Sequence, residues 1–64
     1  MATKKAQDIA QWDVLIIELG TRITVHDIRE FSTPNGYFYV LAVQWPNGDI
    51  GLLTKNHNES LNVE

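Results

Sequence analysis

The segment Tyr37–Thr54, YFYVLAVQWPNGDIGLLT, has the pattern of two strands joined by a tight turn. Up to Trp45 it is interrupted by one polar side chain, Gln44, and is dominated by aromatic and β-branched residues, which favour a pleated surface. Pro46–Gly48 supplies the backbone angles of a type I turn followed by a glycine bulge. Gly51, inside the return strand, indicates a bulge or a close approach of another backbone segment. We therefore expect a β-hairpin at the centre of the fold.

Alternation along a strand divides the first half of this hairpin into two faces, both of them apolar. The aromatic face consists of Tyr37, Tyr39, Leu41, Val43 and Trp45. The opposite face consists of Phe38, Val40, Ala42 and Gln44. Such a strand must either curl through a small barrel or meet another chain. We expect the opposite face to form the base of the core and the aromatic face to be free for contact.

Two further strands are expected before this hairpin. Arg22–Ile28, RITVHDI, alternates between polar and apolar residues as a half-buried strand does. Trp12–Leu19 fits two structures. Its β-branched residues and its length favour a strand, whereas the helical spacing of its apolar residues fits a helix that is capped by Thr3 and ends at Gly20. We favour the strand and keep the helix as the alternative.

The other segments are expected to be connections and a last strand. Glu18–Thr21 has the composition of a turn, and Arg29–Gly36 that of a loop anchored by Phe31. Lys55–Glu64 is polar, with alternating apolar residues near its end. This pattern indicates a loop or one helical turn followed by a short closing strand.

The polar segment 1–11 is expected to be a flexible or short helical N-terminal arm, followed by a single domain over residues 12–64. A chain of 64 residues has room for one core and buries about 60% of its unfolded surface. Four or five short antiparallel strands with tight turns predict a mainly β fold. A small curved barrel is the expected architecture, because closure removes exposed strand edges.

Three stretches of the chain resemble the bacterial SH3-like (Src-homology-3-like) domains. These are Gly20–Val25 (GTRITV), Gly36–Val40 (GYFYV) and Asn47–Leu53 (NGDIGLL), which match that family's glycine-threonine strand, glycine-aromatic strand and G-x-x-G hairpin end. The resemblance implies a small SH3-like barrel of four to five antiparallel strands that serves as a binding module. Leu52 stands where that family usually has tryptophan, so the resemblance implies no particular ligand.

Composition narrows the classes of function. The chain has no cysteine and two histidines, which argues against a thiolate or histidine-only metal site, and we expect no cofactor. Its net charge of −3 disfavours nucleic acid, whose binding depends on neutralising phosphates. The sequence lacks the apolar run that a membrane span or a signal peptide needs. We therefore expect a cytoplasmic protein that does not insert into a membrane.

Two groups of residues could suggest an enzyme, and both have simpler explanations. His26 and Asp27 could be a base and its orienting carboxylate, but neighbouring residues of a strand point to opposite faces. His57 and Glu59 could be metal ligands, but no third ligand is near in the sequence, and zinc needs three or four. We expect both groups to be structural or solvated and the protein not to be an enzyme.

Aromatic residues carry the functional expectation, because tyrosine and tryptophan are enriched at protein interfaces. We expect a non-enzymatic protein-interaction module or small accessory subunit, which binds a protein partner or itself. The expected contact residues are Tyr37, Tyr39, Trp45, Trp12 and Asp49, with Glu30 also at an acidic rim. The alternative is a nucleic-acid-binding small barrel that uses the same rings together with Arg22, Arg29 and Lys55.

Overall fold

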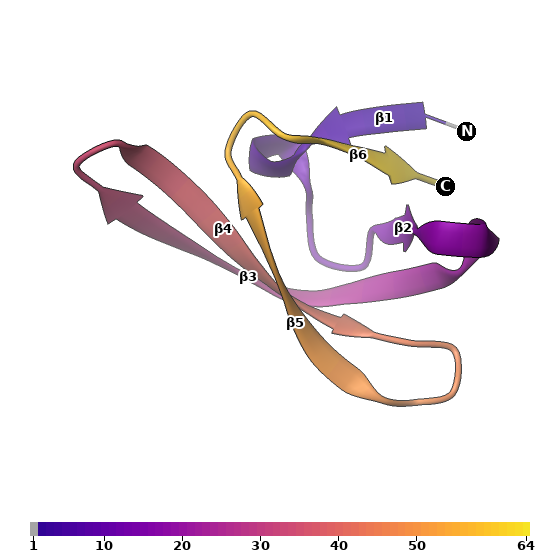
Figure 1. Cartoon of the computed structure of the whole chain (residues 1–64). Coiled ribbons are helices and arrows are strands. Elements are labelled where there is room, and N and C mark those ends of the chain that lie inside the picture. Colours follow the sequence, from indigo (N-terminus) through magenta and orange to yellow (C-terminus); the bar gives the residue numbers. More distant parts are fainter. Residues whose placement is uncertain (1) are drawn as a thin grey trace.

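The computed structural model describes Ala2–Glu64 and consists of one six-stranded antiparallel sheet in the order β1-β6-β2-β3-β4-β5 (Figure 1). The strands are β1 (Ala2–Lys5), β2 (Val14–Ile16), β3 (Arg22–Thr33), β4 (Gly36–Gln44), β5 (Ile50–Asn56) and β6 (Ser60–Val63). Two single turns of 3-10 helix, η1 (Ala6–Asp8) and η2 (Glu18–Gly20), complete the described elements. The mainly β fold is confirmed.

The expected closed barrel of four to five strands is wrong, because the sheet is open and has six strands. The N-terminal segment adds a strand at one end of the sheet, and β6 inserts between this strand and β2. Strand β5 is therefore left as the edge at the other end. No helix within Ala2–Glu64 has the length and apolar character to cross a membrane.

The central hairpin is confirmed. The amide of Gly48 donates to the carbonyl of Trp45 at 2.9 Å, and the amide of Trp45 donates to the carbonyl of Asp49 at 2.8 Å. Gly48 has a φ of +95°, which glycine adopts at little cost. These bonds form the type I turn and glycine bulge that the sequence predicts.

Strand β3 is longer than expected, and the expected loop over Arg29–Gly36 is wrong. The strand continues to Thr33, and a two-residue turn then leads directly into β4. Pairing with the apolar strand β4 stabilises the polar end of β3, where Phe31 stacks on Phe38 with ring centroids 5.4 Å apart. The register shifts between Val25 and Asp27, which marks a β-bulge.

The strand is confirmed within Trp12–Leu19, and the helical alternative is wrong. Strand β2 covers Val14–Ile16 and is followed by the predicted turn, here η2. Leu19 has a φ of +59° and Gly20 a φ of +74°, so both residues of this turn lie in the left-handed region.

The expected flexible or helical arm is also wrong, apart from the three residues of η1. All four residues of β1 pair with β6, from Ala2 opposite Val63 to Lys5 opposite Ser60. Ala6 and Ile9, which follow β1, are buried. The predicted closing strand is confirmed as β6, and it gives the polar N-terminal segment a partner for its backbone hydrogen bonds. Met1, part of the expected arm, lies outside the described residues.

The core is built on the face of β4 that we expected to be free. Leu41 and Val43 are fully buried, and Val43 lies opposite Val25 in β3. The buried apolar cluster consists of Ile9, Leu15, Ile23, Val25, Leu41, Val43 and Val63. The face of β4 that carries Phe38, Val40 and Ala42 therefore points away from the core, and the expected assignment of the two faces is wrong. We call the two sides of β3, β4 and β5 the inner and the outer face.

Candidate interaction surface

The outer face carries a continuous set of apolar side chains across three strands. It consists of Phe31 from β3, of Phe38, Val40 and Ala42 from β4, and of Ile50 and Leu52 from β5. Cross-strand pairs link its members: Phe38 lies opposite Phe31, and Ala42 lies opposite Leu52. Phe31 is 47% exposed, Ile50 63% and Leu52 70%. The molecule thus presents apolar side chains to solvent on the reverse of the sheet that covers its core.

Local sequence explains why these side chains point outward. Leu52 and Leu53 are neighbours in β5, so only one of them can face the core. Leu53 lies opposite the buried Leu41 and packs against the core, which leaves Leu52 outside. Exposed apolar patches that extend over several strands mark interaction sites more often than single exposed residues do.

Trp12 lies at one end of the outer face. Its ring meets that of His26 edge to face with centroids 5.0 Å apart, and the Nε2 atom of His26 lies 2.8 Å from the Oε1 atom of Gln44. Gln44 in turn lies opposite Ile50. Trp12 is 60% exposed and has a φ of +76°, a conformation that few bulky residues adopt. The structure thus brings one predicted contact residue, Trp12, to the outer face.

The other predicted contact residues lie on the inner side. Tyr39 and Trp45 pack against the core cluster, and Asp49 lies in the turn after Trp45, where its carboxylate accepts from the side-chain amide of Asn47. Tyr37 is exposed and its ring lies 4.7 Å from that of His57. The structure does not bring all five predicted residues together. Their role in binding a partner stays a prediction.

Glu30, which the sequence predicts at an acidic rim beside the aromatic contact residues, is in contact with one of them, Tyr39. The hydroxyl of Tyr39 donates to the Oε2 atom of Glu30 at 2.8 Å. This hydrogen bond, more than any other cause, raises the pKa of Tyr39 above its ordinary value of 10.0. The bond holds Tyr39 along the β3–β4 ribbon, because residues 30 and 39 are directly opposite in the register.

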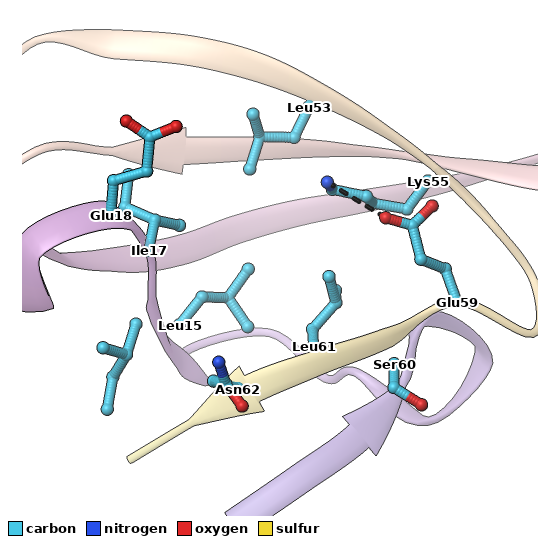
Figure 2. A pocket seen from close by; sticks show the side chains of 10 residues that line it. Leu15, Ile17, Glu18, Leu53, Lys55, Glu59, Ser60, Leu61 and Asn62 are labelled. Atoms are coloured by element: carbon cyan, nitrogen blue, oxygen red, sulfur yellow. Dashed lines mark ion pairs between the residues drawn. The ribbon is translucent and has the colours of Figure 1, made fainter.

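A groove of about 410 Å³ opens between β5 on one side and β2 and β6 on the other. Figure 2 shows Leu15, Leu53 and Leu61 directed into it, with the ion pair between Lys55 and Glu59 at one end. The groove marks the place where the sheet curls without closing. Its lining is mixed, since apolar side chains lie beside the polar residues Glu18, Lys55, Glu59, Ser60 and Asn62.

The basic residues proposed for nucleic acid are engaged with carboxylates. Ion pairs join Lys4 to Asp13, Arg22 to Glu64, Arg29 to Asp27 and Lys55 to Glu59. The hydrogen bond from Arg29 is the largest of the causes that lower the pKa of Asp27. Exposed pairs of this kind contribute little to stability, but they neutralise the charges that phosphates would need.

Neither candidate group for chemistry is assembled. The Nδ1 atom of His57 lies 3.2 Å from the carbonyl oxygen of Tyr37, and Glu59 is paired with Lys55. His26 contacts Gln44, whereas Asp27 bonds with Arg29 and with the amide of Ile28. Within Ala2–Glu64 no three histidine, cysteine or acidic residues are grouped to hold a metal ion.

The contact residues predicted from the sequence do not include Phe31, Ile50 and Leu52, which the structure exposes on the outer face. The sequence places Phe31 in a loop, and it places Ile50 and Leu52 on one face of the return strand without indicating whether that face is covered. The alternation of Ile50 and Leu52 was a usable signal, since both share one side of β5 with Thr54. It could not be used without knowing which side of β4 faces the core.

Comparison with known proteins supplies no relative. No protein-family model matches the chain, and no curated protein matches it. The outer face, with its exposed apolar side chains, is therefore the feature from which a function can be inferred.

Proposed function

We propose that this protein is a non-enzymatic interaction module, which binds a protein partner or a second copy of itself through the outer face. The observation that carries the proposal is the exposed apolar set on the reverse of the core, in which Ile50 and Leu52 are largely in solvent. Burying one such side chain fully is worth about 1.5–3 kcal/mol, so covering several of them would drive association. We place this function in the cytoplasm, following the expectation from the sequence.

The make-up of the outer face supports a protein as its partner. Interface centres are rich in aromatic and large aliphatic side chains and poor in charge, with polar residues around them. Here Phe31 and Phe38 stack at one end, and Arg29 with Asp27 borders the apolar residues in β3. The face lies on paired strands, so a partner would meet a surface that needs little ordering.

The proposed function agrees with the resemblance of this chain to the bacterial SH3-like domains, which we limit to short stretches of its strands and turns. The stretches that resemble that family are Gly20–Val25, Gly36–Val40 and Asn47–Leu53. This resemblance implies a binding module, and it implies no particular ligand.

The nucleic-acid alternative has weaker support. Stacked Phe31 and Phe38 could receive bases, but Arg22, Arg29 and Lys55 are paired with carboxylates and the net charge is −3. A titration of labelled single-stranded DNA and RNA at increasing salt separates the two proposals. Binding that weakens steeply with salt would favour nucleic acid, and no binding at low salt would remove it.

The test of the proposed function compares three immobilised proteins in extract from the native host. These are the wild type, a double variant Ile50→Thr with Leu52→Thr, and the control Leu19→Asn. Threonine keeps strand propensity while removing apolar area, and Leu19 is an exposed leucine away from the outer face. We expect a defined set of proteins, or added copies of the chain, to bind the wild type and the control and not the double variant.

Circular dichroism and thermal unfolding must show that all three proteins are folded. Equal binding to all three folded proteins would contradict the proposal, since removing the exposed apolar area would then have no effect. The proposed function would also be contradicted if the double variant bound these proteins while the wild type and the control did not.

A further inference from the structure

Strand β5 has a free edge, and the register shows which of its peptide groups point there. Within Ala2–Glu64 it pairs with β4 alone and ends the sheet. The bonds from Trp45 to Asp49 and from His57 to Tyr37 flank this ladder, and antiparallel bonding alternates along it. Residues 51, 53 and 55 therefore bond to β4, and the peptide groups of Ile50, Leu52 and Thr54 face the free edge.

This edge has few of the features that usually prevent strands from pairing between molecules. Proteins protect edges with proline, bulges, very short strands or charged side chains, including charges that point inward. Strand β5 has seven residues, its register with β4 is regular, and its sequence IGLLTKN contains no proline. Its single charged residue, Lys55, points to the inner side opposite Tyr39, and its pairing with Glu59 of the same chain neutralises the charge that would otherwise protect the edge. The edge is thus ready to accept another strand.

We propose that a second copy of this chain pairs antiparallel with β5 around a two-fold axis through Leu52. This inference depends on the proposed function and names its partner, a second copy, which joins at the β5 edge so that the outer faces of the two copies become continuous. Two Leu52 side chains meet on the outer face, and each Ile50 lies opposite the Thr54 of the other copy. On the inner side each Asp49 lies opposite the other copy's Lys55, so two pairs of opposite charge flank the axis.

The register follows from the side-chain pattern. Edge-facing residues must pair with one another and each face must stay continuous. Of the symmetric registers that meet these conditions, those centred on Leu52, Leu53 or Thr54 pair at least five of the seven residues of β5. Centring on Leu53 would place Lys55 opposite Gly51, and centring on Thr54 would place it opposite Leu53. Only the register at Leu52 aligns Lys55 with an acidic residue and joins the two exposed leucines.

Both charged groups can make these contacts in addition to those within their own chain. Asp49 is exposed in the turn before β5, and its carboxylate, which accepts from Asn47, has further acceptor positions. Lys55 Nζ lies 3.2 Å from Glu59 of its own chain, and an ammonium group has three donors, so it can bind a second carboxylate. The resulting interface is isologous, as two-fold dimers require.

The sharpest test uses two single variants, Asp49→Lys and Lys55→Asp, alone and mixed. Each variant alone places like charges opposite each other at both positions. In the mixture, the two introduced side chains lie opposite each other, and the native Lys55 of the first variant lies opposite the native Asp49 of the second. Every pair is then again of opposite sign. By sedimentation equilibrium at low salt we expect a dimer for the wild type, a shift to the 7.3 kDa monomer for each variant, and a heterodimer for the mixture.

A backbone variant gives an independent readout. Thr54→Pro removes an amide that faces the free edge and leaves the ladder to β4 in place, as edge strands tolerate. We expect it to lose the dimer while keeping its circular dichroism spectrum, and we expect the control Thr54→Val to keep both. If Thr54→Pro fails to fold, the variants Asp49→Lys and Lys55→Asp still test whether two copies pair through β5.

Three results would overturn the inference: a monomeric wild type at millimolar concentration, a dimer that survives Thr54→Pro, or a mixture that behaves as its separate components. A monomer whose Ile50→Thr and Leu52→Thr double variant loses another protein would overturn this inference and leave the proposed function standing. A monomer that binds the same proteins with and without these substitutions would overturn both.

Discussion

Gly51→Ala is the substitution whose outcome the structure predicts most sharply. A Cβ atom at residue 51 would lie 2.7 Å from Cζ3 and 3.1 Å from Cη2 of Trp45. Carbon atoms in contact prefer about 3.5–4 Å, so the indole ring would have to move by about 1 Å. The bulge or backbone approach that the sequence predicts at Gly51 is therefore wrong, because the register there is regular and the approaching group is the side chain of Trp45.

Two opposing effects decide the sign of this substitution. Replacing glycine by alanine in a strand normally stabilises by about 0.5–1 kcal/mol, because the unfolded chain loses freedom. Overpacking against a partly buried ring costs about 1–3 kcal/mol. We expect a net loss of about 1–2 kcal/mol, a large fraction of the stability on the order of 3–10 kcal/mol for a chain of this length.

A double-mutant cycle with Trp45→Val separates the two effects. Valine keeps strand propensity and is too short to reach residue 51. Urea unfolding followed by circular dichroism gives the free energy of unfolding for the wild type, both single variants and the double variant. In the Trp45→Val background we expect Gly51→Ala to stabilise by about 0.5–1 kcal/mol. A neutral or stabilising effect of Gly51→Ala in the wild-type background would refute the reasoning.

Three further outcomes follow from local geometry. Leu19→Asn should raise the free energy of unfolding by about 1 kcal/mol, since Leu19 has a φ of +59° with an exposed side chain and asparagine tolerates that conformation; an unchanged urea midpoint would contradict this. The amide of Ala10, followed by the ammonium group of Lys4, holds the pKa of Asp13 below its ordinary value of 3.8. Its stabilising contribution is therefore present above pH 3.8 and is lost as the pH falls through the lower folded pKa, so Asp13→Asn should flatten the acid side of the stability profile. Glu30→Gln should lower the raised pKa of Tyr39 toward 10.0 in an absorbance titration, and an unchanged titration would show that the hydrogen bond is not its cause.

Local side-chain chemistry was sufficient to predict several elements of the fold from the sequence. The turn at Pro46–Gly48 formed as predicted because proline and glycine restrict the backbone angles wherever they occur. The β-branched residues in Val14–Ile16 favoured the strand over the helix, and that preference held. Glycine at position 51 indicated crowding, but only the structure shows that the side chain of Trp45 causes it.

Pairing partners decided the elements that sequence reasoning missed. Strand β1, ATKK, has no strand pattern of its own and exists because β6 supplies its hydrogen bonds. The extension of β3 to Thr33 depends in the same way on the length of β4. Local propensity says little about such segments, because strand propensity is mainly a property of the neighbours.

The alternation of side chains in the sequence determined which residues of β4 and β5 share a face. It could not determine which face is buried, because both faces of β4 are apolar. Tertiary structure decided which face is the inner one. Val25 of β3 lies opposite Val43, and together with Leu15 they bury the side of β4 that holds Leu41. That choice sends Leu52 outward and creates the outer face, since burial against other strands, and not the strand itself, selects the side that leaves water.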